Sequence, residues 1–415
     1  MRVTDPRPHL LWVNHFAAAL DMGGGTRHFE LGRELVRRGW RVTIAASDFH
    51  VHRREYLRRA DATDKRTIVE EVDGVTFAWL WAAPYTRNDF RRVRNWLSFS
   101  MRVWRFGRQM DAPDVVIGSS PHLFAALAAQ RVAQGLRRPF ILEVRDLWPE
   151  SLAVSGGKPG MGYHALGALA RFLYARARRI VVLAEGVREY LAKRGHSLDK
   201  LALVPNGVDV TPFTETPDPD SRPFRLVYAG AHGPANGLDT VLEAAAMLRD
   251  NRAVQFVLMG DGPAKSALVE RARTMHLTNV EFRDSVAKTA IPQALGSNGA
   301  GLMVLRDLPL FAFGVSPNKL FDYWAARLPV ICNVPGEVAR LVQDAQGGIV
   351  TRDSSAAALA EAVQALVALS PAERQSLGEQ GRAWVERERD RPLLAERLDQ
   401  VLRPMLSATA APHRR

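Results

Sequence analysis

The sequence predicts an α/β protein with two Rossmann-like domains, each a doubly wound parallel sheet covered by helices. Three observations lead to this prediction. Short apolar segments alternate with helix-forming segments over almost the whole chain, as in repeated βαβ units. The alternation is interrupted by a segment rich in Pro, Asp and Thr, residues 206–222, and then begins again. The 415 residues are also enough to give each half its own core.

The first half supplies the strands and helices of the first predicted domain. Helical patterns cover residues 26–38 and 123–135. The predicted strands are the apolar runs at 9–16, 40–47, 75–81, 114–120, 139–146, 179–185 and 201–206.

The second half repeats this plan. Its predicted strands are the runs at 224–230, 254–260, 280–285, 301–306, 329–334 and 347–351. We therefore expect a first domain at 1–205, a linker at 206–222, a second domain at 223–385, a C-terminal helix at 386–405 that packs back toward the first domain, and a frayed tail at 406–415. Ligands of open α/β sheets bind outside the carboxyl ends of the strands, so we expect the two domains to face each other across a ligand-binding cleft.

Composition and charge argue against several classes of protein. The chain has 47% apolar residues, as globular proteins do, but no run of the roughly 18 needed for a membrane-spanning helix. We expect no secretory signal, and the single cysteine, Cys332, leaves no internal disulfide, which favours a cytoplasmic setting. The net charge of +12 favours acidic partners. Because no zinc-finger or RNP-like motif is present, we expect no nucleic-acid binding.

Three glycines, Gly23–Gly25, follow the first predicted strand and precede Arg27 and His28. The glycines allow a ligand to approach the backbone closely, although a tight turn alone would also explain them. The two basic residues stand where the helix dipole disfavours them. Their position predicts that an anion lies nearby.

The segment 313–334 predicts a second anion site. Ser316 and Pro317 fit a helix N-cap and first position, which would place Lys319 in the first turn. Lysine is scarce here, with seven among 56 basic residues, and a bound diphosphate would explain one at that place. The alternative is a solvated surface lysine. Asp322 either accepts a hydrogen bond from a sugar hydroxyl or favours the start of the helix.

A glycine loop also opens the second domain, after its first strand. Gly230, Gly233 and Gly237 would admit a ligand, while His232 and Asn236 could hydrogen-bond to it. His232 could equally be a structural residue of the loop. Gly260 and Asp261 begin a similar loop after the next strand.

Charged residues end a strand of the first domain. Glu143, Arg145 and Asp146 lie together at its carboxyl end, where they are costly unless paired or facing a cleft. A structural Arg–Asp pair is the simpler explanation. His122 follows Ser119 and Ser120 at the end of the neighbouring strand.

The segment from Arg87 to Arg108 is strongly basic. A helical projection gathers most arginines on one side and Val93, Trp96, Leu97, Val103 and Trp104 on the other. Such a helix suits an anionic membrane surface. A helix that packs its apolar side on the core and exposes its basic side would have the same sequence.

Taken together, these segments resemble the family-4 glycosyltransferases of GT-B fold. The resemblance is closest to the branch of N-acetyl-L-fucosaminyltransferase-like enzymes of O-antigen and capsule synthesis. It covers nearly the whole chain and rests on segments that occur in the family's order: GGGTRHFELGRELVRRGWRVTI, GSSPH, EVRDLWPES, VPNGVD, YAGAHGPANGLDTVLEAA, LMGDGP and SPNKLFDYWAARLPVI.

This resemblance implies retaining transfer of a sugar from a UDP-sugar, without a required metal or other cofactor. The acceptor would be a polyprenyl-diphosphate-linked sugar or another glycan, and the enzyme would work at the inner face of the membrane. The implied catalytic residues are Lys319, Asp322 and Arg27. The implied donor-binding residues are Gly24, Gly25, His232, Gly233, Asn236, Gly260, Asp261, Ser316, Asn318, Lys319 and Asp322. The implied acceptor-binding residues are His122, Glu143, Arg145 and Asp146.

The chain departs from the family pattern at several positions. The usual pair of glutamates falls on Gly314 and Asp322, and the usual arginine and lysine of the second domain's first loop fall on Ala231 and Asn236. The usual histidine of the acceptor side falls on Arg145. Lys319 is therefore the expected source of positive charge at the phosphates. A non-hydrolysing UDP-sugar 2-epimerase and an inactive partner protein of the same fold remain the alternatives.

Overall fold

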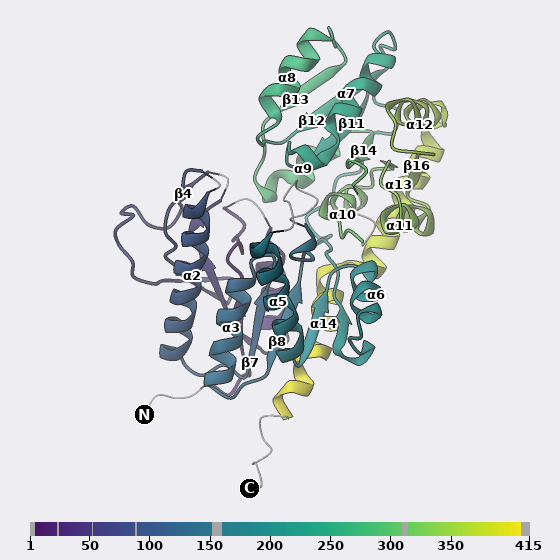
Figure 1. The fold of residues 1–415 in the computed structure, drawn as a ribbon. Coiled ribbons are helices and arrows are strands. Elements are labelled where there is room, and N and C mark those ends of the chain that lie inside the picture. The colour runs from purple at the N-terminus through teal and green to yellow at the C-terminus, as the bar shows by residue number, and fades with distance from the viewer. Residues whose placement is uncertain are drawn as a thin grey trace. The chain divides into compact units, whose positions relative to one another are not determined.

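The computed structural model describes residues 5–22, 25–51, 53–87, 89–151, 160–308 and 314–407. Its internal contacts divide the chain into two compact units. Unit 1 consists of Met1–Pro205 and Pro392–Arg415, and unit 2 consists of Asn206–Arg391. Each is a parallel α/β unit, as the sequence predicted (Figure 1).

Unit 1 is built on an eight-stranded sheet. In spatial order its strands are β10 (Leu201–Leu203), β9 (Arg179–Val182), β8 (Phe140–Val144), β7 (Val115–Ser119), β1 (His9–Val13), β2 (Arg41–Ser47), β6 (Val75–Leu80) and β5 (Ile68–Val72). Neighbours are parallel except that β5 pairs antiparallel with β6 at the edge. This edge strand, whose sequence IVEEV carries two adjacent glutamates, and the small two-residue hairpin strands β3 (Phe49–His50) and β4 (Glu55–Tyr56) were not predicted.

Helices cover both faces of this sheet. They are α1 (Arg27–Arg37), α2 (Phe90–Gln109), α3 (Leu123–Gly135), α5 (Met161–Arg176), α6 (Glu185–Lys193) and α14 (Arg391–Ser407), with a single 3₁₀ turn at Leu198–Lys200. In β1, Leu10 and Trp12 belong to the core cluster that contains residues of α1 and α14. Leu11 and Val13 are equally buried but point to the other face, as strand alternation requires. There α3 packs on β7 and lies beside α2 (Figure 1).

The last helix, α14, is fastened to unit 1. The side chains of Leu394, Leu398 and Leu402 join the core beside α1. The indole Nε1 of Trp40 donates a hydrogen bond of 2.6 Å to Asp399 Oδ1. The chain thus returns to its first unit only after Arg391, six residues later than the boundary at 385 expected from the sequence.

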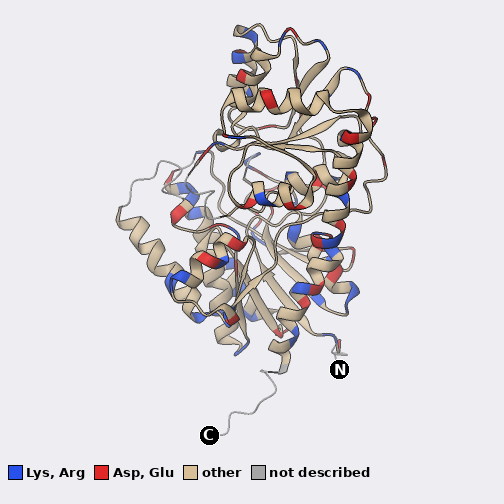
Figure 2. Ribbon diagram, turned by 90° about the vertical axis from the view of Figure 1, so that its right-hand side faces the viewer, with Lys and Arg blue, Asp and Glu red and all other residues tan. Residues whose placement is uncertain are grey.

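Unit 2 is built on a six-stranded, fully parallel sheet. Its strands in spatial order are β13 (Val280–Arg283), β12 (Val254–Met259), β11 (Phe224–Ala229), β14 (Ala300–Met303), β15 (Val330–Cys332) and β16 (Gly348–Val350). The covering helices are α7 (Leu238–Met247), α8 (Lys265–Thr274), α9 (Ile291–Gly296), α10 (Asn318–Ala325), α11 (Glu337–Ala345), α12 (Ala356–Ala368) and α13 (Pro371–Glu388). The strands of both units are drawn mostly in tan in Figure 2, because charged residues concentrate on helices and loops.

Two hydrophobic cores lie on opposite faces of this second sheet. One contains α7, α8 and α12, and the other contains α9, α10, α11 and α13. Helix α10 lies close to β14, because a Cβ on Gly301 would stand only 2.4 Å from Cγ of Tyr323. The Tyr323 hydroxyl also accepts a 2.8 Å hydrogen bond from the backbone N–H of Ala229. These contacts fix the start of α10 relative to the carboxyl end of β11.

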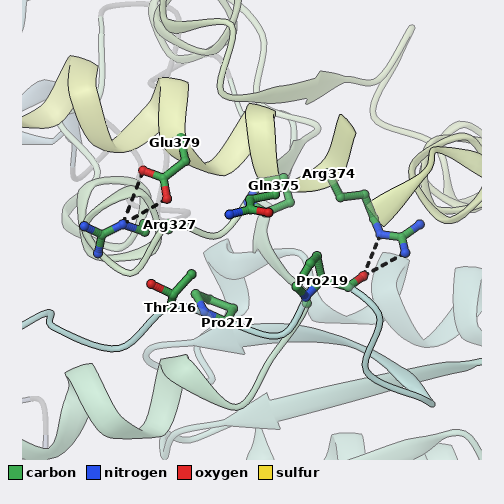
Figure 3. A pocket seen from close by; sticks show the side chains of 9 residues that line it. Thr216, Pro217, Pro219, Arg327, Arg374, Gln375 and Glu379 are labelled. Carbon is green, nitrogen blue, oxygen red and sulfur yellow. Dashed lines mark hydrogen bonds and ion pairs between the residues drawn. The ribbon is translucent and has the colours of Figure 1, made fainter. Parts of the chain in front are cut away.

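The segment 206–222, expected to be a linker, packs against unit 2. Phe213 is buried in its core, and Arg374 donates 2.7 Å from Nη2 to the carbonyl of Pro219. A shallow crevice runs along this seam. Figure 3 shows Arg374 directed at Pro219 and Arg327 paired with Glu379 there. None of the predicted site residues lines the crevice.

Candidate functional site

Two glycine loops interlock at the carboxyl ends of β11 and β12. A Cβ on Gly260 would lie 1.9 Å from the carbonyl oxygen of Gly230, so the loops can approach only because glycine stands there. The φ angle of Gly260 is +151°, which also favours glycine. The N–H of His232 donates 2.8 Å to the carbonyl of Asp261, whose carboxylate is exposed and accepts from the N–H of Gly262. The sequence-predicted loops are therefore brought together.

His232 is the buried member of this group. Its side chain has no exposed surface, and neither ring nitrogen has a hydrogen-bond partner among the described residues. Burial, with a smaller contribution from the charge of Lys265, lowers the pKa of His232, so the ring is neutral at pH 7. The ring keeps one donor and one acceptor unused. Gly233 and Asn236 lie in the same loop, where the N–H of Asn236 donates 3.1 Å to the carbonyl of Gly233.

Lys319 lies in the first turn of α10, as predicted. Its Nζ donates a hydrogen bond of 3.0 Å to the hydroxyl of Tyr228 and stands 4.2 Å from the centre of that ring. A Cβ on Gly230 would lie 3.5 Å from Lys319 Cε, so the lysine is beside the glycine loop. Among the described residues no carboxylate pairs with it. Burial lowers the pKa of Lys319 to about 7.

Asp322 lies one turn further along α10 and already has a cation. Lys288 Nζ, from the 3₁₀ turn Lys288–Ala290, donates 2.7 Å to Asp322 Oδ1. Sequence reasoning missed Lys288, although the scarcity of lysine could have drawn attention to it. The other carboxylate oxygen, Asp322 Oδ2, has no hydrogen-bond donor among the described residues.

The predicted helix cap at Ser316 is wrong. Helix α10 begins at Asn318, and the N-cap position is held by Pro317, which has no side-chain cap. The Ser316 hydroxyl instead accepts 2.9 Å from the N–H of Asn206, and its carbonyl accepts from the side chain of the same asparagine. Because no side chain caps the helix, its first N–H groups lack a capping acceptor, and Asn318 is exposed beside them.

In unit 1, the anion that the sequence predicted beside Arg27 and His28 is the carboxylate of Glu143. Arg27 Nε donates 3.1 Å to Glu143 Oε1, and His28 Nε2 lies 2.9 Å from Oε2. Arg27 also donates to the carbonyls of Val204 and Pro205. The Arg27 and Glu143 side chains are 2% and 1% exposed. Both side chains are therefore enclosed in the core and paired with each other.

Charge keeps this carboxylate ionised. Burial acts to raise the pKa of Glu143, but contact with the His28 ring and the charge of Arg27 overcome it and hold the pKa below its usual range. Burial also lowers the pKa of His28 to about 4. His28 is therefore neutral at pH 7, and Arg27 is the cation that stabilises Glu143 there.

Arg145, rather than Arg27, lies beside Gly25. One of its guanidinium nitrogens would lie 3.6 Å from a Cβ on Gly25, at the head of α1. Arg145 is partly exposed, and no ion pair joins it to Asp146 or to another carboxylate in the described ranges. The simple Arg–Asp pair is thus not formed. Gly24, also predicted at this loop, lies outside the described residues.

His122 forms a buried pair with a histidine that the sequence analysis did not single out. His122 Nδ1 accepts 3.1 Å from the N–H of Ala125 at the start of α3, so the ring proton is on Nε2. That nitrogen lies 2.9 Å from His15 Nδ1, which must then be the acceptor. The remaining His15 Nε2–H is a buried donor for which no partner is described. The position of His15 directly after a strand was the available signal.

An aromatic group with one cation surrounds this pair. The Trp96 ring lies 5.4 Å from His122 and 5.7 Å from Trp148. Arg92 lies 5.1 Å from the Trp96 ring centre and has no described ion-pair partner. Burial, aided by the charge of Arg92, lowers the pKa of His15 to about 3. Aromatic faces with a free guanidinium are suited to a sugar ring that carries an anionic group.

The described residues show neither a metal cluster nor a membrane-spanning helix. They contain no cluster of His, Cys, Asp and Glu side chains able to hold a metal ion. None of their helices combines the length and apolar character needed to cross a membrane.

Each unit matches a known protein family. Residues 22–207 match the family of glycosyl transferase 4-like domains, and residues 223–368 match the glycosyl transferases group 1. WbjE of Pseudomonas aeruginosa, described as a glycosyltransferase, is 22% identical over 74% of this chain and 78% of its own. TuaC of Bacillus subtilis, whose name refers to teichuronic acid biosynthesis, is 25% identical over 85% of this chain and 88% of its own.

Solved structures give the same fold. The structure of Anabaena HepE in complex with UDP-glucose superimposes with a TM-score of 0.66 at 12% identity, covering 95% of this chain and 99% of that one.

Proposed function

Since the chain carries the two tandem glycosyltransferase domains of a GT-B protein, we propose that it transfers a sugar from a UDP-sugar with retention of configuration. The sugar is an N-acetylated hexosamine or deoxyhexosamine, and the reaction needs no metal. The acceptor is a polyprenyl-diphosphate-linked sugar or another glycan, used in surface polysaccharide synthesis at the inner face of the membrane.

One observation carries the donor assignment. Lys319 is a cation without a described carboxylate partner, in the first turn of a helix whose N–H groups have no side-chain cap, beside a loop that glycine keeps open. A diphosphate supplies the negative charge and the acceptor oxygens that this group lacks. The leaving UDP gains charge in the transition state, so a fixed cation there accelerates transfer. The complex of HepE with UDP-glucose supports the choice of a uridine nucleotide.

The acceptor side is supported by unit 1. Arg92 and Trp96 of α2 provide a cation and a partly exposed ring, next to the buried His15–His122 pair at the carboxyl ends of β1 and β7, where α/β sheets bind ligands. Arg145 adds a second free cation beside Gly25. The name of TuaC supports a polysaccharide product.

The function is tested by incubating the protein with a panel of UDP-N-acetylhexosamines and with polyprenyl-diphosphate-linked N-acetylglucosamine. UDP release that depends on the acceptor, together with an α-linked product from an α-linked donor by NMR, is the expected result. Interconversion of the UDP-sugar without acceptor would indicate an epimerase instead. Neither reaction, with UDP failing to raise the melting temperature, would indicate an inactive partner protein.

A further inference from the structure

Helix α2 presents a stripe of large apolar side chains to solvent. The members of this stripe, spaced three or four residues apart, are Phe90 (72% exposed), Val93 (41%), Leu97 (50%), Met101 (58%) and Trp104 (37%). That spacing puts all five on one face of the helix. Soluble proteins rarely expose so continuous an apolar surface unless something binds it.

The rest of α2 is fixed against unit 1. Asn95, Phe99, Val103 and Gly107 form its buried face. Gly107 is so close to α3 that a Cβ there would lie 2.5 Å from Val132 Cγ2. The helix therefore cannot roll to bury the stripe. Of the apolar residues that the sequence projection grouped together, Val93, Leu97 and Trp104 lie on the solvent side, whereas Val103 is buried.

Arginines flank the stripe. Arg91, Arg94, Arg105 and Arg108 are all exposed, and in the described part of the chain none has an ion-pair partner. Arg108 lies 4.8 Å from the ring centre of Trp104, which keeps a cation next to an exposed aromatic ring. The one acid of residues 87–108, Asp89, is occupied in capping the helix through the N–H of Arg91.

The unpaired arginines beside this stripe indicate which kind of partner covers it. A second copy of the chain, paired through α2, would bring two sets of unpaired arginines together, and their repulsion opposes such a dimer. An anionic bilayer offers hydrocarbon for the stripe and lipid phosphates for the arginines. The pairing of tryptophan and arginine also suits the headgroup level.

We propose that α2 docks this protein on an anionic lipid bilayer, with the five-residue stripe inserted among the headgroups and the four arginines against lipid phosphates. The inference depends on the proposed function in one respect only: docking would bring the enzyme to a lipid-linked acceptor. Docking itself requires no substrate.

Vesicle flotation tests the proposal on the full chain. We expect binding to vesicles of phosphatidylglycerol and phosphatidylcholine, and little binding to phosphatidylcholine alone. The double variant Leu97→Ser/Met101→Ser should weaken partitioning at least about tenfold. Val69→Ser is the matched control, because Val69 is 63% exposed on β5 of the same unit. Arg94→Gln/Arg105→Gln should weaken binding mainly at low salt, whereas Arg137→Gln, at an exposed loop arginine, should not.

Three results would overturn the proposal. They are equal binding to neutral and anionic vesicles, unchanged binding by both double variants, and a dimer in light scattering that Leu97→Ser/Met101→Ser converts to monomer. The assay contains neither nucleotide nor acceptor, so its outcome is independent of the proposed reaction. A protein that floats with vesicles but never releases UDP would contradict only the proposed function.

Discussion

The Nζ of Lys319 donates 3.0 Å to the hydroxyl of Tyr228 and lies 4.2 Å from the centre of its ring. The tyrosine thus holds the ammonium at the mouth of the Gly230 loop without neutralising it. A carboxylate in the same place would compete with a diphosphate for the cation. No described carboxylate therefore competes with a ligand for Lys319, and a bound diphosphate would favour its charged form.

Replacement of Lys319 should show this directly. We expect Lys319→Ala to lower turnover by about a hundredfold to a thousandfold at saturating UDP-sugar, because a preorganised cation on the leaving group is lost. Lys319→Arg should retain part of the activity. Circular dichroism and the melting temperature check that the fold is intact. Near-normal turnover of the alanine variant would remove Lys319 from the catalytic group.

Donor binding should depend on pH through the same lysine. Burial lowers its pKa to about 7, whereas a bound diphosphate favours the charged form. UDP affinity should therefore fall as pH rises above about 7, and binding in that range should take up protons. Calorimetry in buffers of different ionisation enthalpy measures this uptake. Lys319→Arg, which stays charged, should show a flatter profile, and equal profiles would contradict the assignment.

The ligand-free protein should respond to pH in the opposite sense. The folded-state pKa of about 7 lies below the ordinary lysine value of 10.5, so the unfolded chain binds more protons between these two values. This lysine then makes the free energy of unfolding rise with pH over that window. Comparing urea unfolding of the wild type and Lys319→Met at pH 7 and 9 measures its share. No difference in slope would mean that the ammonium is not desolvated.

The Lys288–Asp322 ion pair should position the donor site without acting in the chemical step. Lys288→Ala frees the carboxylate to move, so we expect KM for the UDP-sugar to rise about fivefold to tenfold, or about 1–1.4 kcal/mol, with kcat little changed. Lys265→Ala is the control, since Lys265 pairs with the fully exposed Asp284. A fall in kcat alone would show that Asp322 acts on the transition state.

The Arg27–Glu143 pair should matter for stability. Arg27→Met leaves Glu143 buried without its permanent cation, and we expect it to cost about 3–5 kcal/mol in urea unfolding. Arg145→Ala, at the partly exposed cation beside Gly25, should leave stability nearly unchanged and lower turnover. An Arg27→Met variant that is as stable as the wild type yet inactive would show instead that Arg27 takes part in the reaction.

The sequence by itself determined the order of strands and helices, because strand and helix periodicity and glycine loops are local signals. The apolar runs at 9–16 and 224–230 and the helical pattern at 123–135 all became elements at those places. It also placed Lys319 in the first turn of a helix, since Pro317 marks that start. The two-residue strand β3 is too short to give such a signal, and the glutamates of β5 interrupt its apolar pattern, so both were missed.

Only the tertiary structure decided which charged residues are free. Arg27 and Arg145 look alike in sequence, but one meets Glu143 in the core and the other remains partly exposed beside Gly25. The same holds for α2, whose apolar residues divide into a buried face and an exposed stripe only once α3 has packed against Gly107. Pairing and burial join residues over a hundred positions apart, as in the 116-residue separation of Arg27 and Glu143. No local pattern encodes the partner at that distance.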